Sequence, residues 1–180
     1  TDRPGDENAD FVGVDNRAES KKLIRSFTKK PKRLSALVPY PENVSTIQER
    51  IEGTKEACEA DGIEYNYVDL PEDQEQVNKL IQQELDAGTD SFIALNNKCT
   101  LIALSALNKA GVRIPEDVRL ISFDDSEAFR YMDPPISALR QPIVQIGLQT
   151  VDRMYERLKK SKSPGEHFIL DCDFQARESH

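Results

Sequence analysis

A regular alternation of short apolar runs with longer segments of helical spacing constrains the fold of this chain most strongly. Short apolar runs predict buried strands, and apolar residues at intervals of three and four predict helices. Glycines separate several of the segments, as at Gly62, Gly88 and Gly111. A strand–helix series of this kind predicts an α/β fold with a doubly wound parallel sheet and right-handed crossovers. The expected strands are 11–14, 34–38, 65–70, 92–95 and 118–123, and the expected helices are 18–27, 45–60 (N-capped by Ser45 or Thr46), 71–87 and 98–110.

The pattern changes after Phe123. A proline-containing loop without clear periodicity is expected over 124–136, followed by a short strand over 136–139 and a final strand over 168–174. Between these strands, 143–158 has the spacing of a long amphipathic helix. Its expected buried side consists of Ile143, Ile146, Leu148, Val151, Met154, Tyr155 and Leu158.

Two adjacent carboxylates, Asp124 and Asp125, directly follow the apolar run 118–123. In an open parallel α/β sheet, ligands bind just beyond the carboxyl ends of the strands. This position predicts that Asp124 lies at the edge of a ligand site. For Asp125, capping of the following turn is the favoured interpretation.

The charge of the chain bears on its partners. The net charge is −8, whereas a surface that binds duplex DNA needs cationic residues, so the chain by itself is not expected to bind DNA. The basic cluster 29–33 is interpreted as a solvated connection between a helix and a strand, with a phosphate or partner contact as the alternative. The longest apolar runs are far too short to span a bilayer, so no membrane contact is expected.

The chain offers little for catalysis or metal binding. Its cysteines, Cys58, Cys99 and Cys172, have no paired spacing and are expected to be reduced thiols that fill apolar space. The histidines are His167 and His180, and neither forms part of a recognisable nucleophile–base set. We therefore expect no metal, no cofactor and no enzymatic activity.

The segment RIPEDVRLISFDD (113–125), with PPISAL (134–139) and RQP (140–142) after it, resembles the signature RIPeDv…iGFDd…PPlTtv.QP of the LacI family of bacterial repressors, which respond to sugars and purines. Shorter segments match the same family in order along the chain. They are 1–3 (TDR), 14–16 (VDN), 49–53 (ERIEG), 95–97 (LNN) and 177–179 (RES).

The resemblance implies a periplasmic-binding-protein-like fold of two lobes, between which the chain crosses three times. It places 1–15 and 142–161 in the N-terminal lobe, of which only a remnant would be present. It places 16–141 and 164–178 in a complete C-terminal lobe. In that family Asp2 would lie within the effector domain, so the resemblance also implies a fragment that lacks the DNA-binding headpiece.

The resemblance also implies a site for a small-molecule effector, which is expected to be a sugar or a related metabolite. Arg50 and Asp124 are the principal expected ligands, because a guanidinium fork and a carboxylate can hydrogen-bond adjacent hydroxyls. The other expected effector-binding residues are Asn96, Gln141, Asp2 and Asp15. A simpler alternative for Arg50 is a surface ion pair with neighbouring glutamates, and for Asp124 it is a cap.

One departure from the family bears on the choice of ligand. Family members often carry an aromatic residue where this chain has Leu70, and a ring there would stack on the ligand. Leu70 offers only aliphatic contact, and Tyr40 is expected to compensate from the neighbouring strand end. This difference weakens the expectation of a pyranose or purine effector.

The expected helix 98–110 has apolar residues on more than one side. The resemblance implies a homodimer in which this helix pairs with the loop before Pro134. The expected interface consists of Leu101, Ile102, Ser105, Tyr131 and Met132, and the alternative is deeper burial of the helix within its own lobe.

The leading hypothesis is therefore the effector-binding and dimerisation part of a cytoplasmic LacI-type transcriptional regulator. It would contact operator DNA only through the absent headpiece. The alternative is a periplasmic sugar-binding protein of a transport system, which shares the fold.

Overall fold

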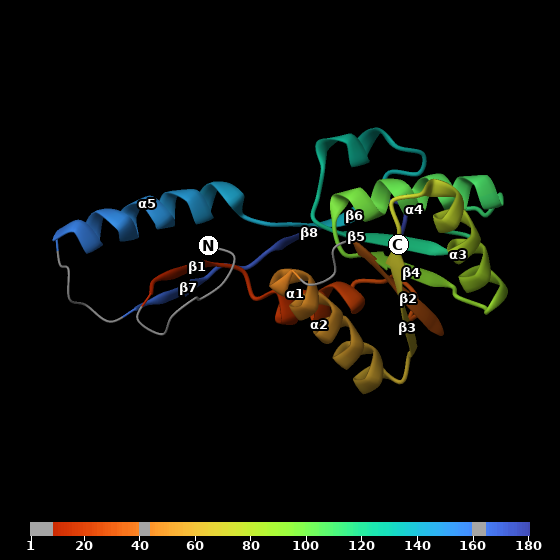
Figure 1. Cartoon of the computed structure of the whole chain (residues 1–180), viewed down its shortest axis with the longest axis horizontal. Helices are drawn as coiled ribbons and strands as arrows, with labels where there is room; N and C mark the ends of the chain where they lie inside the picture. Colours follow the sequence, from red (N-terminus) through yellow and green to blue (C-terminus); the bar gives the residue numbers. More distant parts are fainter. Residues whose placement is uncertain (1–8, 40–43, 160–164) are drawn as a thin grey trace.

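The computed structural model describes residues 9–39, 44–159 and 165–180. It contains a large α/β body and a smaller extended one (Figure 1). The smaller body is formed by β1 (Phe11–Gly13), α5 (Ile143–Lys159) and β7 (His167–Ile169), with β1 and β7 paired in parallel. The chain passes between the bodies from β1 to α1, from β6 to α5 and from β7 to β8.

The larger body is a twisted sheet in the order β3-β2-β4-β5-β6-β8. All neighbouring strands are parallel except β8, which runs antiparallel to β6. This arrangement confirms the predicted α/β fold with a parallel-dominated sheet. The strands are β2 (Arg33–Pro39), β3 (Glu64–Leu70), β4 (Ser91–Ala94), β5 (Arg119–Phe123), β6 (Ser137–Arg140) and β8 (Asp173–Gln175).

Helices cover both faces of this sheet, so the core has two parts. On one face α1 (Asn16–Ile24) and α2 (Ser45–Asp61) pack with residues such as Leu23, Cys58 and Phe123. On the other face α3 (Gln74–Asp86) and α4 (Asn97–Ala110) pack with residues such as Ile81 and Leu107. Burial on both faces explains why the central strands read as continuous apolar runs.

Several details differ from the sequence-based predictions. The N-cap of α2 is Val44, which makes no side-chain cap hydrogen bond, so the assignment of Ser45 or Thr46 was wrong. The expected loop 124–136 contains a 3-10 helix, η1 (Glu127–Tyr131).

The prediction of one final strand over 168–174 was also wrong. The segment forms two strands, β7 and β8, in different sheets, with residues 170–172 between them. Residues 167–169 consequently pair with β1 rather than with the larger sheet to which they had been assigned. Each of these strands is selected by a distant partner, which explains why the local pattern does not reveal the division.

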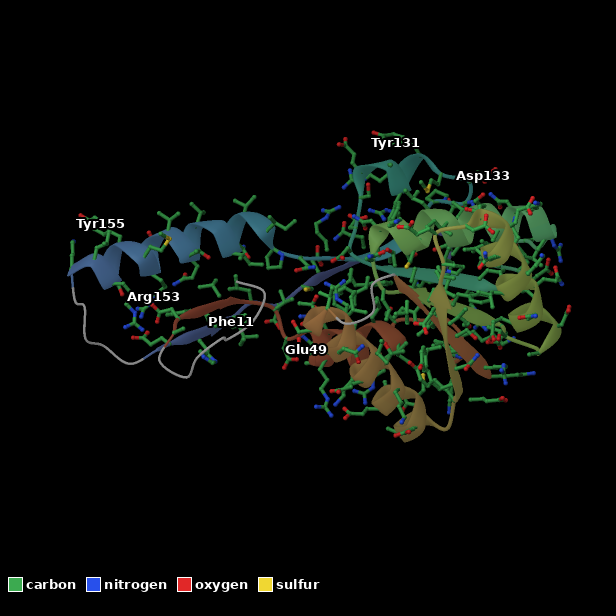
Figure 2. All side chains as sticks on the ribbon, viewed as in Figure 1. Phe11, Glu49, Tyr131, Asp133, Arg153 and Tyr155 are labelled. Atoms are coloured by element: carbon green, nitrogen blue, oxygen red, sulfur yellow. The ribbon has the colours of Figure 1, made fainter. Side chains whose placement is uncertain are left out.

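Helix α5 differs most from expectation, because its apolar side is exposed. Ile143, Leu148, Val151, Met154, Tyr155 and Leu158 are each 61–84% exposed. The buried residue is Arg153, which faces β1 and β7, binds Asp10 and lies 5.1 Å from the ring of Phe168. Figure 2 shows Arg153 on the side toward the small sheet and Tyr155 on the outer side. Nothing in the described part of the chain covers the apolar side.

Candidate functional site

Close packing of α1 against α2 positions Arg50. Gly53 lies one helical turn after Arg50, and a Cβ atom at Gly53 would lie 2.3 Å from the carbonyl oxygen of Arg17. Only glycine therefore permits this approach of the two helices. The approach brings Asn16, the first residue of α1, beside Arg50.

The Arg50 guanidinium is buried, and several elements hold it. Its Nε donates to Oδ1 of Asn16 (2.9 Å), and its Nη1 donates to the carbonyl of Leu95 (2.7 Å) and to Oδ2 of Asp124 (2.9 Å). The carbon at the centre of the guanidinium lies 3.8 Å from the centroid of the Phe123 ring, a cation–π contact. Arg50 thus joins α1 and α2 to the carboxyl ends of β4 and β5.

Asp124 occupies the first position after β5 and has a φ of 83°, in the left-handed region. Its carboxylate accepts hydrogen bonds from Arg50 and from the side-chain amide of Gln141. Gln141 belongs to the segment that leaves β6 for α5. The structure therefore brings Arg50, Asp124 and Gln141 together where the chain passes between its two bodies.

A cavity of about 180 Å³ is lined by Arg50 and Gln141 of this group, whereas Asp124, which binds both of them, is not part of the lining. The cavity lies between the two bodies, because its lining comes from β1, α1, α2, α5 and the connection before α5. The polar side chains in its lining belong to Asn16, Thr46, Arg50 and Gln141, and the apolar ones to Phe11, Val14 and Ile146. A concave space with a few convergent polar groups is the usual form of a small-molecule site.

Asp125 lies beside Asp124 but has a different role. It accepts from Nε and Nη2 of Arg140 (3.0 and 2.6 Å) and binds Nη2 of Arg177 (2.8 Å). The predicted capping role was wrong, because η1 has Ser126 as its N-cap and no side-chain cap hydrogen bond. The Asp125 carboxylate instead forms ion pairs with arginines from two separate segments, Arg140 at the end of β6 and Arg177 after β8.

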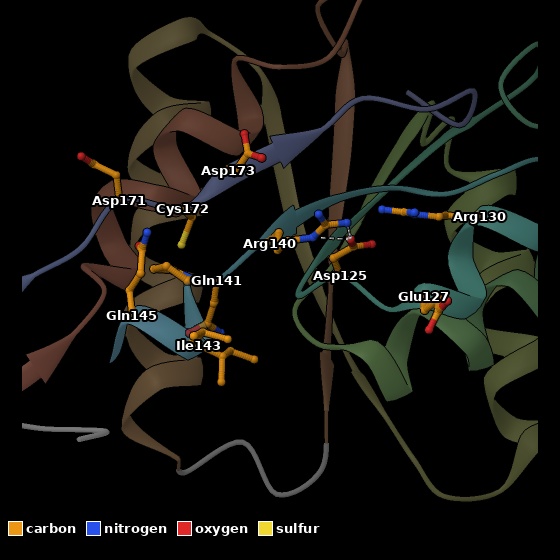
Figure 3. A pocket seen from close by; sticks show the side chains of 12 residues that line it. Asp125, Glu127, Arg130, Arg140, Gln141, Ile143, Gln145, Asp171, Cys172 and Asp173 are labelled. Carbon is orange, nitrogen blue, oxygen red and sulfur yellow. Dashed lines mark hydrogen bonds and ion pairs between the residues drawn. The ribbon is translucent and has the colours of Figure 1, made fainter. Parts of the chain in front are cut away.

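A second cavity, of about 850 Å³, lies beyond this ion-paired group. Figure 3 shows the Arg140–Asp125 pair with Arg130 and Glu127 on one side, and Cys172 and Asp171 on the other. Its lining has charged residues of both signs, and it includes residues of the two crossings β6 to α5 and β7 to β8, Gln141 among them.

Where the structure describes them, the remaining predicted effector-binding residues cap helices or lie in the core. Asn96 caps α4 by accepting from the N–H of Cys99 (2.8 Å), and Asp15 caps α1 by accepting from the N–H of Ala18 (2.9 Å). Leu70 is buried in the core on the α3 and α4 face, away from Arg50. Asp2 and Tyr40 lie outside the described residues.

Asn16 is the polar residue near Arg50 that the sequence analysis missed. Its amide oxygen accepts from Arg50, and its amide nitrogen donates to Oε2 of Glu49 (3.1 Å). Asn16 stands in the 14–16 segment that carried part of the family resemblance, so that segment was the available signal.

The thiols are unsuited to nucleophilic chemistry. Burial raises the pKa of Cys58, of Cys99 and of Cys172 to about 12, so each is protonated near neutral pH. Among the described residues, no cluster of histidine, cysteine and carboxylate side chains could bind a metal ion. Within the same residues, no helix combines the length and hydropathy needed to cross a bilayer.

The predicted dimer residues belong to α4 and to η1 with the residue after it, and Ile102 and Met132 pack against the same part of the core. On α4 Leu101 is 47% exposed and Ser105 is exposed, whereas Ile102 is half-buried. Tyr131 is 81% exposed and projects from η1 near α4 (Figure 2), and Met132 packs partly against the core.

Residues 28–180 match the family model described as a periplasmic binding protein-like domain. The chain belongs to this family. Within it, the chain resembles the LacI family of transcriptional regulators, as predicted. It is 25% identical to the HTH-type transcriptional regulator CelR of Thermobifida fusca, over 97% of this chain and 53% of CelR. It is 34% identical to the repressor PurR of Haemophilus influenzae, over 64% of this chain and 36% of PurR.

A solved structure shows the same periplasmic binding protein-like fold. A LacI family transcriptional regulator from Enterococcus faecium with bound ribose superimposes with a TM-score of 0.84 at 20% identity, over 99% of this chain and 67% of that one. The chain thus spans about half the length of CelR and a smaller share of PurR.

Proposed function

We propose that this chain is the effector-binding and dimerisation part of a LacI-type DNA-binding transcriptional regulator in the cytoplasm. The observation that carries the proposal is the group Arg50, Asp124 and Gln141. Arg50 and Gln141 line a cavity at the crossing between the two bodies, and both bind Asp124.

The chemistry of this group fits a sugar or a related polyhydroxy metabolite. Asp124 supplies a hydrogen-bond acceptor and is about one-quarter exposed, whereas the planar donor Arg50 is almost completely buried. Adjacent hydroxyls can donate to such a carboxylate and accept from such a guanidinium. The bound ribose of the Enterococcus faecium regulator supports the same ligand class.

The mechanism follows from the position of Gln141. Its amide donates to Asp124 and holds the start of the crossing into α5 against the larger body. An effector hydroxyl that takes the same carboxylate oxygen would release this contact. The effector would then favour one arrangement of the two bodies over the other and thereby alter DNA binding through a headpiece outside this chain.

Calorimetry of the 180-residue chain with ribose, glucose and cellobiose tests the proposal. Arg50→Gln is expected to weaken binding of the sugar that binds by about 10- to 100-fold, because it removes hydrogen bonds to a charged group. If Arg50→Gln does not fold by circular dichroism, Gln141→Ala provides the same test. Absence of binding to every sugar would reject a sugar effector, and wild-type affinity of the folded variants would reject the site.

Arg119→Gln is the matched control. Arg119 is also a buried arginine bound to an aspartate, Asp90, at 3.2 Å, and it also lies over a phenylalanine ring, that of Phe27. It lies at the opposite end of β5. Arg119→Gln is therefore expected to lower stability without changing the affinity for the sugar.

A periplasmic transport protein is the competing proposal. The reading frame upstream of Thr1 distinguishes the two. A helix-turn-helix there supports the regulator, and a signal peptide supports the transport protein. The relatives CelR and PurR, both named as regulators, favour the first outcome.

A further inference from the structure

Asp124 adopts a backbone conformation that residues other than glycine seldom adopt. It is the one non-glycine residue of the described chain with a positive φ, 83°. In this region the Cβ atom is crowded against the backbone, so a local interaction must hold an aspartate there. The same conformation sets the direction in which the carboxylate leaves the end of β5.

Two buried hydroxyls lie against this backbone. Ser122 and Thr100 are both fully buried. The Ser122 Oγ donates to the carbonyl oxygen of Asp124 at 2.8 Å, and it lies 2.7 Å from Oγ1 of Thr100. Thr100 belongs to α4, so the two hydroxyls connect the first turn of that helix to the turn after β5.

The donors can be assigned by counting protons, because each hydroxyl has only one. Thr100 Oγ1 also lies 3.0 Å from the carbonyl of Asn96, which can accept two hydrogen bonds but has a donor without the hydroxyl, the backbone N–H of Thr100 (3.2 Å). With Thr100 donating to Ser122 and Ser122 donating to Asp124, every acceptor in the group has a donor.

We propose that Thr100 and Ser122 are positioning residues for Asp124, and that their hydroxyl pair fixes the left-handed backbone that directs the carboxylate toward Arg50 and Gln141. The LacI signature quoted above has glycine where this chain has Ser122, so the hydroxyl distinguishes this chain from the signature. The consequence for ligand affinity rests on the proposed function, whereas the backbone role does not.

A double-mutant cycle in urea unfolding tests the backbone role without a ligand. Ser122→Ala is expected to lower the unfolding midpoint of the wild-type chain. In the Asp124→Gly background it should lower the midpoint clearly less, because glycine adopts a positive φ without help. An equal decrease of the midpoint in both backgrounds would overturn the proposal. That result is expected if the Ser122 hydroxyl stabilises the fold without affecting the backbone conformation of Asp124.

Ser35→Ala is the control for the cycle. Ser35 is a fully buried serine in β2 that binds Glu84 and Thr89 and has no contact with Asp124, since β4 lies between β2 and β5. Ser35→Ala is expected to lower the unfolding midpoint by the same amount in the wild-type and Asp124→Gly backgrounds.

The second readout is affinity for the sugar identified by calorimetry. Thr100→Val is expected to weaken binding about three- to ten-fold, the value of one neutral hydrogen bond, whereas Thr100→Ser keeps the hydroxyl and the affinity. Equal affinities for Thr100→Val and Thr100→Ser would contradict the positioning role. If no sugar binds to the wild type, the proposed sugar effector fails and the unfolding cycle alone decides the positioning role.

Discussion

The carbonyl oxygen of Arg17 would lie 2.3 Å from a Cβ atom placed on Gly53, so α1 and α2 meet backbone to backbone at this point. The contact determines whether Asn16 can reach Arg50. Alanine usually stabilises a helix interior relative to glycine by about 0.5–1 kcal/mol. Gly53→Ala is expected to do the opposite and destabilise the chain by about 2 kcal/mol, because the helices must separate. Urea unfolding measures the change.

Gly147→Ala is the matched control for that measurement. Gly147 lies inside α5, and a Cβ atom there meets nothing within 4 Å. The substitution should therefore show the ordinary gain of about 0.5–1 kcal/mol. If Gly53→Ala and Gly147→Ala both stabilise, the close approach of α1 and α2 is incorrect.

Asp125 should matter for stability more than surface ion pairs do. Asp125→Ala would leave Arg177, a largely buried side chain, without its carboxylate. Loss of one partner from a buried pair typically costs 3–5 kcal/mol, and about 3 kcal/mol is expected here because Arg140 is 42% exposed. Asp117→Ala breaks the exposed pair with Arg113 and should cost less than about 1 kcal/mol. Similar unfolding free energies for the two variants would contradict the assignment.

The attachment of α5 to the segment before β1, through Asp10, should depend on pH. Hydrogen bonds from Arg157 and from the backbone of Glu166 hold the pKa of Asp10 well below its usual range. Because the folded pKa is lowered, the stabilisation is present above the unfolded value near 3.9 and is lost as pH falls below it. The protection factors of the α5 amides, which correct for the intrinsic pH dependence of exchange, should therefore fall between about pH 4 and pH 2 in the wild type.

Asp10→Asn isolates this effect, because other carboxylates titrate equally in both proteins. The variant should exchange α5 amides faster than the wild type at pH 6, and the difference should shrink below about pH 3. A difference that stays constant over this range would show that Asp10 does not hold α5 by its charge.

The proposed homodimer has a direct test in sedimentation. Leu101→Glu would place a charge on the exposed side of α4, next to Ser105 and near Tyr131, and should shift the chain toward monomer. Gln83→Glu, on the exposed side of α3, should leave the dimer intact. A wild-type chain that sediments as a monomer at tens of micromolar would refute the interface.

The alternation of strands and helices could be predicted from sequence because it depends on local patterns. The strands β2, β4 and β5 are buried on both faces, so their apolar runs are continuous, and each helix between them ends near a glycine or a turn. The division of 167–175 into β7 and β8 could not be predicted, because each strand is selected by a partner far away in sequence.

The candidate site shows the same distinction. Arg50, Asp124 and Gln141 were identified from their motifs, and the structure brings them together. Asn16 was missed because its role depends on the approach of α1 to α2 at Gly53. Asp125 was assigned to a cap because its arginine partner Arg177 lies in the C-terminal segment.

Nuclear magnetic resonance of the ¹⁵N-labelled chain during titration with the sugar identified by calorimetry tests the central claim most directly. The Nε–H of Arg50 and the side-chain amide of Gln141 report on the two donors to the site. The account predicts that both resonances shift in proportion to ligand occupancy while the Nε–H of Arg119 does not. Gln141 lines both cavities, so Arg50 decides between them. Binding that shifts Arg130 and Arg140 beside the larger cavity, and leaves Arg50 unchanged, would contradict the proposed site.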